Sequence, residues 1–229
     1  MFDSYKFHCS SLGRLMTNPR SGTGLSETCK TELLKIWIYK KYGRTKIETN
    51  KYVEKGLAQE EEGISLYSRA VNTFFKKNIE TFENEFIIGT PDIIHSNIVR
   101  DIKCSWDIFT FFEVFTDPIN KAYVLQINGY WELIPGCTAG KLVYTLVNTP
   151  LEILEKEKSQ LRFKMGIIDY EANGVYNMAV EEIEKNGTFD DIPLNERWIE
   201  FEIPKLDMSE VYKRVPVWRE FLNNLNRTR

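Results

Sequence analysis

The sequence predicts an α/β protein in which a short mixed β-sheet is flanked by helices and followed by a helical C-terminal region. Segments that alternate apolar and polar residues indicate half-buried strands, and longer segments with apolar residues at helical spacing indicate amphipathic helices. The strand-like segments are 98–103, 140–147 and 198–203, and the helix-like segments are 27–42, 51–72 and 120–134. A chain of 229 residues that is 42% hydrophobic suits a single domain, with a core at 1–150 and an extension packed on it at 151–229.

The two helix-like segments near the N-terminus differ in what they predict. Ser26 is a good N-cap for the first of them and Gly43 is a good C-terminal stop. In the second, Glu60, Glu61 and Glu62 lie about 100° apart around the helix axis, so that only one of them can face a neighbouring hairpin well. Two interpretations remain open: one glutamate faces inward as a metal ligand, or all three lie on a solvated acidic face.

Residues 89–103 predict a β-hairpin that carries two acids and a lysine. The turn residues 95–97 separate an apolar strand end from a strand with period-two alternation. This period places Asp101 and Lys103 on one face, and a tight turn brings Asp92 beside Asp101. Crowded carboxylates repel unless a cation lies between them, and oxygen ligands favour a hard ion such as magnesium or manganese. The hairpin therefore predicts a metal site, although a hairpin with a solvated polar edge carries the same residue types.

The helix-like segment 120–134 carries Gln126 and Tyr130 four positions apart and therefore on one helix face. Such a pair can hydrogen-bond a phosphate and a nucleophilic water, although many ordinary helix surfaces carry it too. The aromatic segment 105–112, with Asp107 as an N-cap, can pack in the core or stack on bases.

The region beyond the strand-like segment 140–147 predicts helices, and its residues indicate no function. A highly charged helix follows Pro150 and ends near Lys164. A final helix at 208–226 is a candidate for packing between protomers.

The composition limits the location and the partners of the protein. There is no apolar run long enough to span a bilayer and no signal peptide at the N-terminus, so we expect a cytoplasmic protein. A net charge of −3 does not indicate nucleic-acid binding by itself, but carboxylates that bind a metal ion are neutralised by it. Lysines and an arginine between positions 30 and 46 can form a local basic patch.

The cysteines and histidines exclude several kinds of metal site. The four cysteines, at positions 9, 29, 104 and 137, form no C-x-x-C pair, which argues against zinc and iron–sulfur centres and for reduced thiols. His8 and His95 are too few and too far apart for a zinc site.

Four short motifs occur along the chain in a fixed order, and together they carry a family resemblance. They are Gly56-x-x-x-Glu60, Thr90-Pro91-Asp92, Asp101-x-Lys103 and Gln126-x-x-x-Tyr130. In order and spacing they resemble the PD-(D/E)xK nuclease superfamily, and most closely its phage lambda exonuclease (YqaJ-like viral recombinase) branch. Residues 7–22 look like the opening helix and loop of that branch, and the similarity extends to about Pro150. The resemblance implies a restriction-endonuclease-like core.

The resemblance also implies roles for the residues of the catalytic motifs. Glu60, Asp92 and Asp101 would be metal ligands, with the backbone carbonyl of Ile102 as a further ligand. Lys103 would be the catalytic lysine. The family spacing thus selects Glu60 among the three consecutive glutamates.

A second set of residues would bind the 5′-phosphate of a DNA end. The resemblance places Ser10, Thr90 and Gln126 there, with Tyr130 on the same helix face as Gln126. The family uses an arginine ahead of the opening helix, but this chain has Asp3 at that position. Lys6 nearby and then Arg14 are the candidate cations.

Together the motifs predict a magnesium-dependent or manganese-dependent deoxyribonuclease with two ions in each active site. The resemblance implies an exonuclease that resects linear double-stranded DNA from 5′ to 3′ in phage recombination, within the host bacterial cytoplasm. It also implies a homotrimeric ring around DNA and, as a partner, a single-strand annealing protein. Two alternatives remain: a structure-specific or site-specific endonuclease on the same core, and a non-catalytic DNA-binding module.

Overall fold

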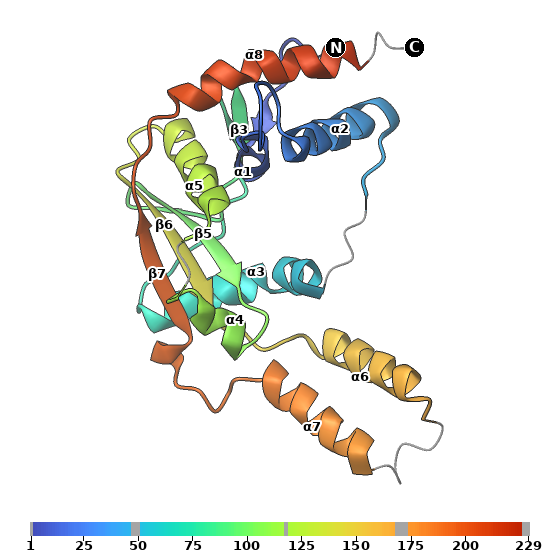
Figure 1. Cartoon of the computed structure of the whole chain (residues 1–229). Helices are drawn as coiled ribbons and strands as arrows, with labels where there is room; N and C mark the ends of the chain where they lie inside the picture. The colour runs from blue at the N-terminus through green and yellow to red at the C-terminus, as the bar shows by residue number, and fades with distance from the viewer. Residues whose placement is uncertain (1, 47–50, 117–118, 168–173, 226–229) are drawn as a thin grey trace.

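The computed structural model describes residues 2–46, 51–116, 119–167 and 174–225, and for residues 51–58 it describes the backbone alone. Two small β-sheets form the centre of this part of the chain, with helices around them (Figure 1). The predicted α/β class is therefore confirmed, with the difference that the strands form two sheets and not one.

The larger sheet has the strand order β4-β5-β6-β7 and contains the predicted hairpin. Strand β4 (Ile93–His95) pairs antiparallel with β5 (Ile98–Cys104), and β5 pairs parallel with β6 (Ala139–Thr145). Strand β7 (Trp198–Ile203) closes the sheet antiparallel to β6, so a segment far along the chain completes it. Both the hairpin and the strand at 198–203 agree with the sequence prediction.

The smaller sheet was not predicted from the sequence. Strand β3 (Ile87–Gly89) lies in its middle, parallel to β1 (Phe7–His8) and antiparallel to β2 (Phe82–Glu83). Strands of two or three residues are too short for the alternation of apolar and polar residues to reveal them. Because β3 leads directly into Thr90-Pro91-Asp92, this sheet positions the first acid of the hairpin.

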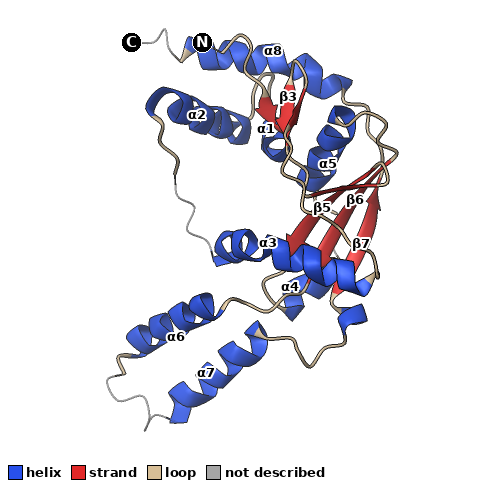
Figure 2. Cartoon of the chain, turned by 180° about the vertical axis from the view of Figure 1, so that it is seen from behind, coloured by secondary structure: helices blue, strands red, loops and turns tan. Residues whose placement is uncertain are grey.

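The helices surround the two sheets (Figure 2). They are α1 (Leu12–Leu15), α2 (Glu27–Tyr42), α3 (Lys51–Ala70), α4 (Ile108–Glu113), α5 (Lys121–Leu133), α6 (Leu151–Met165), α7 (Gly174–Gly187) and α8 (Ser209–Asn224), with 3-10 turns η1 at Cys9–Ser11 and η2 at Leu194–Glu196. Helix α2 has its predicted ends: the Ser26 hydroxyl accepts the Cys29 N–H, and Gly43 adopts a φ of 63°. Asp107 caps α4 as predicted.

Two helices differ from their predicted ranges. The opening segment, expected to be helical, has only one α-helical turn (α1), since Phe7 and His8 pair with β3 and a 3-10 turn follows them. The predicted end of the last helix, at 226, lies outside the described residues, and α8 begins at Ser209.

Helix α8 belongs to the main core. Trp218 is fully buried and its indole packs edge-on against the ring of Phe7, with 5.0 Å between the ring centroids. The Phe2 N–H donates to the Asn223 side chain, so that the N-terminal segment and α8 lie together at one end of the molecule (Figure 1). Through β7 and α8, the region beyond residue 150 contributes both to the larger sheet and to the core around it.

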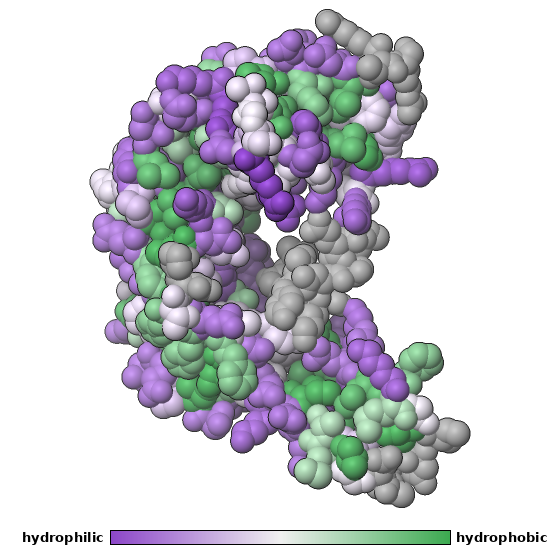
Figure 3. Space-filling model, in the orientation of Figure 1, coloured by the Kyte–Doolittle hydropathy of each residue, from purple (hydrophilic) through white to green (hydrophobic). Residues whose placement is uncertain are grey.

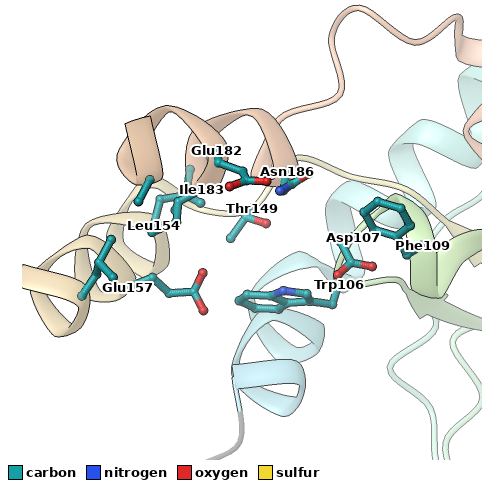
Figure 4. Close-up of a pocket in the computed structure, with 12 residues that line it drawn as sticks. Trp106, Asp107, Phe109, Thr149, Leu154, Glu157, Glu182, Ile183 and Asn186 are labelled. Atoms are coloured by element: carbon teal, nitrogen blue, oxygen red, sulfur yellow. The ribbon is translucent and has the colours of Figure 1, made fainter. Parts of the chain in front are cut away.

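Helices α6 and α7 pack on each other and project from the sheets (Figure 2). Large apolar side chains are exposed on this pair, among them Phe163 and Met178, and apolar surface gathers at this end of the molecule (Figure 3). A cavity of about 380 Å³ lies between the pair and the start of α4, with Trp106 and Leu154 in its lining (Figure 4). None of the site residues predicted from the sequence lines this cavity.

Candidate active site

Asp101 and Lys103 lie on one face of β5, as the alternation of this strand predicts. The Lys103 Nζ lies 2.7 Å from Asp101 Oδ2 and 4.9 Å from the centroid of the Tyr123 ring. Asp101 has only 2% of its side chain exposed, whereas Lys103 has 28% exposed. The lysine therefore connects a buried carboxylate with the surface.

Asp92 reaches the same place from the residue just before β4. Its Oδ2 accepts a hydrogen bond from the backbone N–H of Ile102 at 2.6 Å. Strand β4 does not extend far enough to pair with Ile102, so this side chain takes the place of a backbone carbonyl. The N–H and C=O of one strand residue point to the same side of the strand. The Ile102 carbonyl therefore faces the same open edge of β5, which is where the resemblance places a backbone ligand.

The two acids share one poorly solvated space, and their pKa values are raised in the absence of a metal ion. Burial, followed by the charge of Asp101, raises the pKa of Asp92 to about 8, although the Ile102 N–H opposes this shift. Burial also raises the pKa of Asp101, and the Lys103 ammonium opposes that shift. Burial alone would lower the pKa of Lys103, but the carboxylates of Asp101 and Asp92 raise it above its ordinary value.

Gln126 and Tyr130 hold the other side of Asp101. The Gln126 Nε2 donates to Asp101 Oδ1 at 2.9 Å and to the Tyr130 hydroxyl at 2.8 Å. Both side chains are buried, with 8% of Gln126 and 4% of Tyr130 exposed. In this structure Gln126 thus orients a candidate metal ligand, while its predicted contact with a phosphate is untested.

Helix α3 brings Glu60 to the same edge from the other face of the sheet. Gly63 allows this approach, because a Cβ there would lie 2.8 Å from Cys104 Sγ and 2.8 Å from Thr145 Oγ1. Glu60 is one turn before Gly63 and shares its helix face. It has 28% of its side chain exposed, against 81% for Glu61 and 54% for Glu62, and its charge raises the pKa values of both aspartates.

Glu60 is not in contact with the aspartates in this conformation. It forms an ion pair with Lys77, at 3.2 Å between Nζ and Oε1. Among the described residues no three His, Cys, Asp or Glu side chains form a complete set of metal ligands. For Gly56, the first residue of the motif, only the backbone conformation is described, and it is helical.

The residues predicted to bind a DNA end lie around the end of the smaller sheet. Gly89 packs so closely that a Cβ would lie 2.6 Å from the Tyr130 ring and 2.8 Å from Cys9 Sγ. Ser10 follows Cys9 and Thr90 follows Gly89, so both emerge beside the Tyr130 end of α5. Both are exposed, and the Thr90 hydroxyl is 2.8 Å from that of Thr81.

The two candidate cations for this end pocket have carboxylate partners. Lys6 forms an ion pair with Glu83 of β2. Arg14 lies 3.2 Å from Glu32, which also accepts a hydrogen bond from the Ser11 hydroxyl.

Gly63 and Lys77 are site residues that the sequence analysis did not single out. Gly63 had a detectable signal, since a glycine inside a helical pattern often marks close packing. Lys77 lies in an irregular segment after α3, where no pattern indicates that it meets Glu60.

Comparison with known proteins gives matches at the level of structure. No protein-family model matches the chain, and no curated protein does. The fold is similar to that of a phage-related exonuclease from Haemophilus somnus 129PT, with a TM-score of 0.75 and 26% identity over 97% of this chain and 95% of that one.

A second similarity is to LHK-Exo, an alkaline exonuclease from Laribacter hongkongensis, with a TM-score of 0.62 and 13% identity over 97% of this chain and 92% of that one. Its complex with dAMP has a TM-score of 0.58 and 12% identity over 96% of this chain and 88% of that one. These similarities extend over nearly the whole of each chain. Three of the four motifs meet at one edge of β5, and the fourth brings Glu60 toward that edge from α3. The resemblance of this chain to the lambda exonuclease branch of the PD-(D/E)xK nucleases is thereby confirmed.

Proposed function

We propose that this protein is a metal-dependent deoxyribonuclease that resects linear double-stranded DNA from an end, in the 5′ to 3′ direction. The observation that carries this proposal is the crowding of Asp92 and Asp101 at an open strand edge, with Lys103 beside them. The two structural neighbours described as exonucleases support the same class of reaction.

The residues present fit a divalent cation. Asp101 Oδ2 is buried and accepts no hydrogen bond of normal geometry from a described residue, although the Lys103 ammonium lies 2.7 Å away. A single lysine does not neutralise two buried carboxylates, and burial, followed by the charge of Asp101, raises the pKa of Asp92 to about 8. The donors are all oxygens, which suits magnesium or manganese.

Asp92, Asp101 and the Ile102 carbonyl would hold the cation, and Glu60 would join them after turning away from Lys77. A bound cation supplies charge neutralisation at the scissile phosphate and lowers the pKa of a water molecule that it holds. The resemblance implies two such ions in each site.

The side chains of the protein have separate tasks in this scheme. Lys103, with its pKa raised, stays protonated and donates hydrogen bonds that orient a water molecule or a phosphate oxygen. Gln126 fixes the carboxylate of Asp101. Ser10 and Thr90 offer hydroxyl groups at the end of the smaller sheet for a terminal phosphate, with Gln126 and Tyr130 behind them.

A digestion time course tests the activity. Linear duplex DNA with one labelled end is incubated with the protein with and without magnesium, and with manganese in parallel. We expect mononucleotides to be released from the 5′ end only when a divalent ion is present. A label at the 3′ end that is lost first would contradict the direction.

The same assay separates an exonuclease from an endonuclease on the same core. Covalently closed circular DNA has no end, so we expect it to stay intact under conditions in which its linearised form is degraded. Nicking or linearisation of the circle would contradict the proposal and favour the endonuclease.

The assembly and the context are part of the proposal. By resemblance we expect a homotrimer that surrounds DNA in the bacterial cytoplasm, works in phage recombination and passes its 3′ single strand to an annealing protein. No helix in the described part of the chain is long and apolar enough to cross a membrane. A monomeric mass in light scattering, under conditions of processive digestion, would contradict the ring.

A further inference from the structure

A cavity of about 800 Å³ lies between α2 and the start of β1, and its lining is basic and aromatic. Lys35 and Lys40 come from α2, and His8 comes from β1. With Lys6, the described residues of the lining include three lysines and a single carboxylate, that of Glu83. The local charge is therefore positive in a chain whose net charge is −3.

The cavity lies on strands that lead toward Asp92, Asp101 and Lys103, which together are called the acidic site. His8 and Ile88 pair across β1 and β3, and both line the cavity. Two residues further along the chain, just beyond the ends of these strands, are Ser10 and Thr90, and Asp92 follows Thr90 after two more. Four residues of extended chain span at most about 14 Å, so Ile88 and Asp92 lie within that distance of each other. A nucleic-acid strand of a few nucleotides can contact both places.

Aromatic and cationic side chains occur together in the lining. The Lys40 Nζ lies 5.6 Å from the centroid of the Tyr5 ring, and Tyr39, which is 53% exposed, precedes it on α2. Burial and the charge of Lys40 lower the pKa of His8, so this side chain is neutral at pH 7 and can donate or accept a hydrogen bond. Lys6 is ion-paired with Glu83, and Lys35 and Lys40 add two further positive charges to the lining.

We propose that this cavity binds the sugar–phosphate backbone of single-stranded DNA beside the acidic site. Lys35 and Lys40 bind its phosphates, and the exposed ring of Tyr39 stacks on one of its bases. A positive groove with aromatic side chains suits a single strand, whereas the bases of a duplex are already stacked and paired. This proposal deepens the proposed function and rests on it for the identity of the ligand as DNA.

Binding without turnover tests the cavity. The 229-residue chain with Asp101→Asn is titrated into a 12-nucleotide oligothymidylate with a 5′-hydroxyl and a 3′ fluorescent label, over a series of salt concentrations. We expect Lys35→Ala and Lys40→Ala, each in this background, to weaken binding roughly tenfold. Each should also reduce the slope of log affinity against log salt by about 0.7, the value for one phosphate contact on a single strand.

The matched control is Lys213→Ala in the same background. Lys213 lies on α8, outside the cavity, with 69% of its side chain exposed. We expect its affinity and salt slope to stay within about twofold of the parent protein. Thermal unfolding of every variant checks that the fold is intact. If the double variant Lys35→Ala/Lys40→Ala binds the oligonucleotide with unchanged affinity and slope, the proposal is wrong.

Phosphate groups in the cavity could come from an uncut strand or from a released mononucleotide. Thymidine 5′-monophosphate, added as a competitor, distinguishes the two sources. Competition that is lost in the lysine variants identifies the released nucleotide. Oligonucleotide binding that depends on the lysines but resists this competitor identifies the uncut strand, and both outcomes support the cavity.

The proposed function is tested separately from the cavity. A wild-type protein that cleaves no DNA with magnesium would contradict the nuclease function alone, because the binding experiment requires no cleavage. An active wild-type protein whose single-strand binding ignores Lys35 and Lys40 would contradict the cavity alone.

Discussion

The acidic site on β5 and the basic cavity beside β1 and β3 handle charge in opposite ways. In the acidic site Asp101 is nearly fully buried, and Asp92 is crowded against it. In the basic cavity, by contrast, Lys35 is half-buried and Lys40 is exposed. A buried charge cannot be solvated and therefore responds to protons and metal ions, whereas an exposed charge is screened and responds to salt. The difference indicates a site for chemistry beside a site for holding the substrate.

The largest effect should come from breaking the acidic site at β5. We expect Asp101→Asn and Lys103→Ala to lower the rate of DNA cleavage at least about 10³-fold, since each removes a charge at the position of the scissile phosphate. Asparagine keeps an oxygen to accept from Gln126, so Asp101→Asn should fold normally by circular dichroism. Near-native cleavage by either variant at saturating magnesium would exclude this site.

Helix α3 offers an internal comparison of three neighbouring glutamates. We expect Glu60→Gln to lower cleavage about 10²-fold, while Glu61→Gln and Glu62→Gln stay within about threefold, because Glu60 is the least exposed and alone acts on both aspartates. Rates at several magnesium concentrations measure this. An inactive Glu61→Gln or Glu62→Gln beside an active Glu60→Gln would show that the helix presents another face.

The free energy of unfolding should depend on pH through Asp92 in the acidic site. The pKa of Asp92 rises from its ordinary value of 3.8 to about 8 in the metal-free fold, so between these pH values the folded state holds a proton that the unfolded state has lost. Metal-free stability should therefore fall as the pH rises from about 4 to about 8, by an amount on the order of a few kcal/mol. Over the same range magnesium should bind more tightly, because it displaces this proton.

Thermal unfolding at pH 6 and pH 8.5, with and without magnesium, checks this expectation. Stabilisation by magnesium should be larger at pH 8.5. Asp92→Asn should remove the difference between the two pH values, and the exposed control Lys213→Ala should keep it. Equal stabilisation by magnesium at both pH values in the wild type would show that magnesium displaces no proton from Asp92.

Gly63 tests how closely α3 must approach the sheet. An alanine Cβ there would meet Cys104 Sγ and Thr145 Oγ1 at 2.8 Å, so Gly63→Ala should cost about 1–3 kcal/mol of unfolding free energy and displace Glu60. Gly174→Ala, at a helical glycine with no described atom within 4 Å of its Cβ position, should be neutral or slightly stabilising. Denaturant unfolding of both variants measures the contrast. Equal stability would show that α3 has room to move.

The smallest effect should come from Lys6, whose charge is offset by Glu83. We expect a modest preference for 5′-phosphorylated over 5′-hydroxyl ends, and Lys6→Ala should narrow it by less than about threefold, as for an exposed ion pair. Initial rates on the two kinds of end measure it. Equal wild-type rates on the two kinds of end would contradict a phosphate-binding pocket around Ser10 and Thr90. A large effect of Lys6→Ala would show that Lys6 binds the phosphate in place of the family's arginine.

Much of the fold could be predicted because its signals are local. The N-cap at Ser26, the stop at Gly43 and the shared face of Asp101 and Lys103 depend on neighbouring residues, and the structure contains each of them. The predicted half-buried alternation of β5 is not seen, because both faces of this strand are covered and residues 99–102 are all buried. Strands β1 and β3 could not be predicted, since their few residues are held by pairing between segments about eighty positions apart. The choice of Glu60 needed the spacing of a family motif, because three adjacent glutamates look alike in the sequence.

The sequence by itself determined the hairpin, the shared face of Asp101 and Lys103, and the order of the four motifs, because backbone periodicity and short spacings fix these features. Only the tertiary structure decided which groups become buried together. It placed Asp92 against the Ile102 N–H, Gln126 against Asp101, and Lys35 and Lys40 beside His8. Burial and charge proximity depend on how distant segments pack, and they set the pKa values and the local field that the residue types alone leave open.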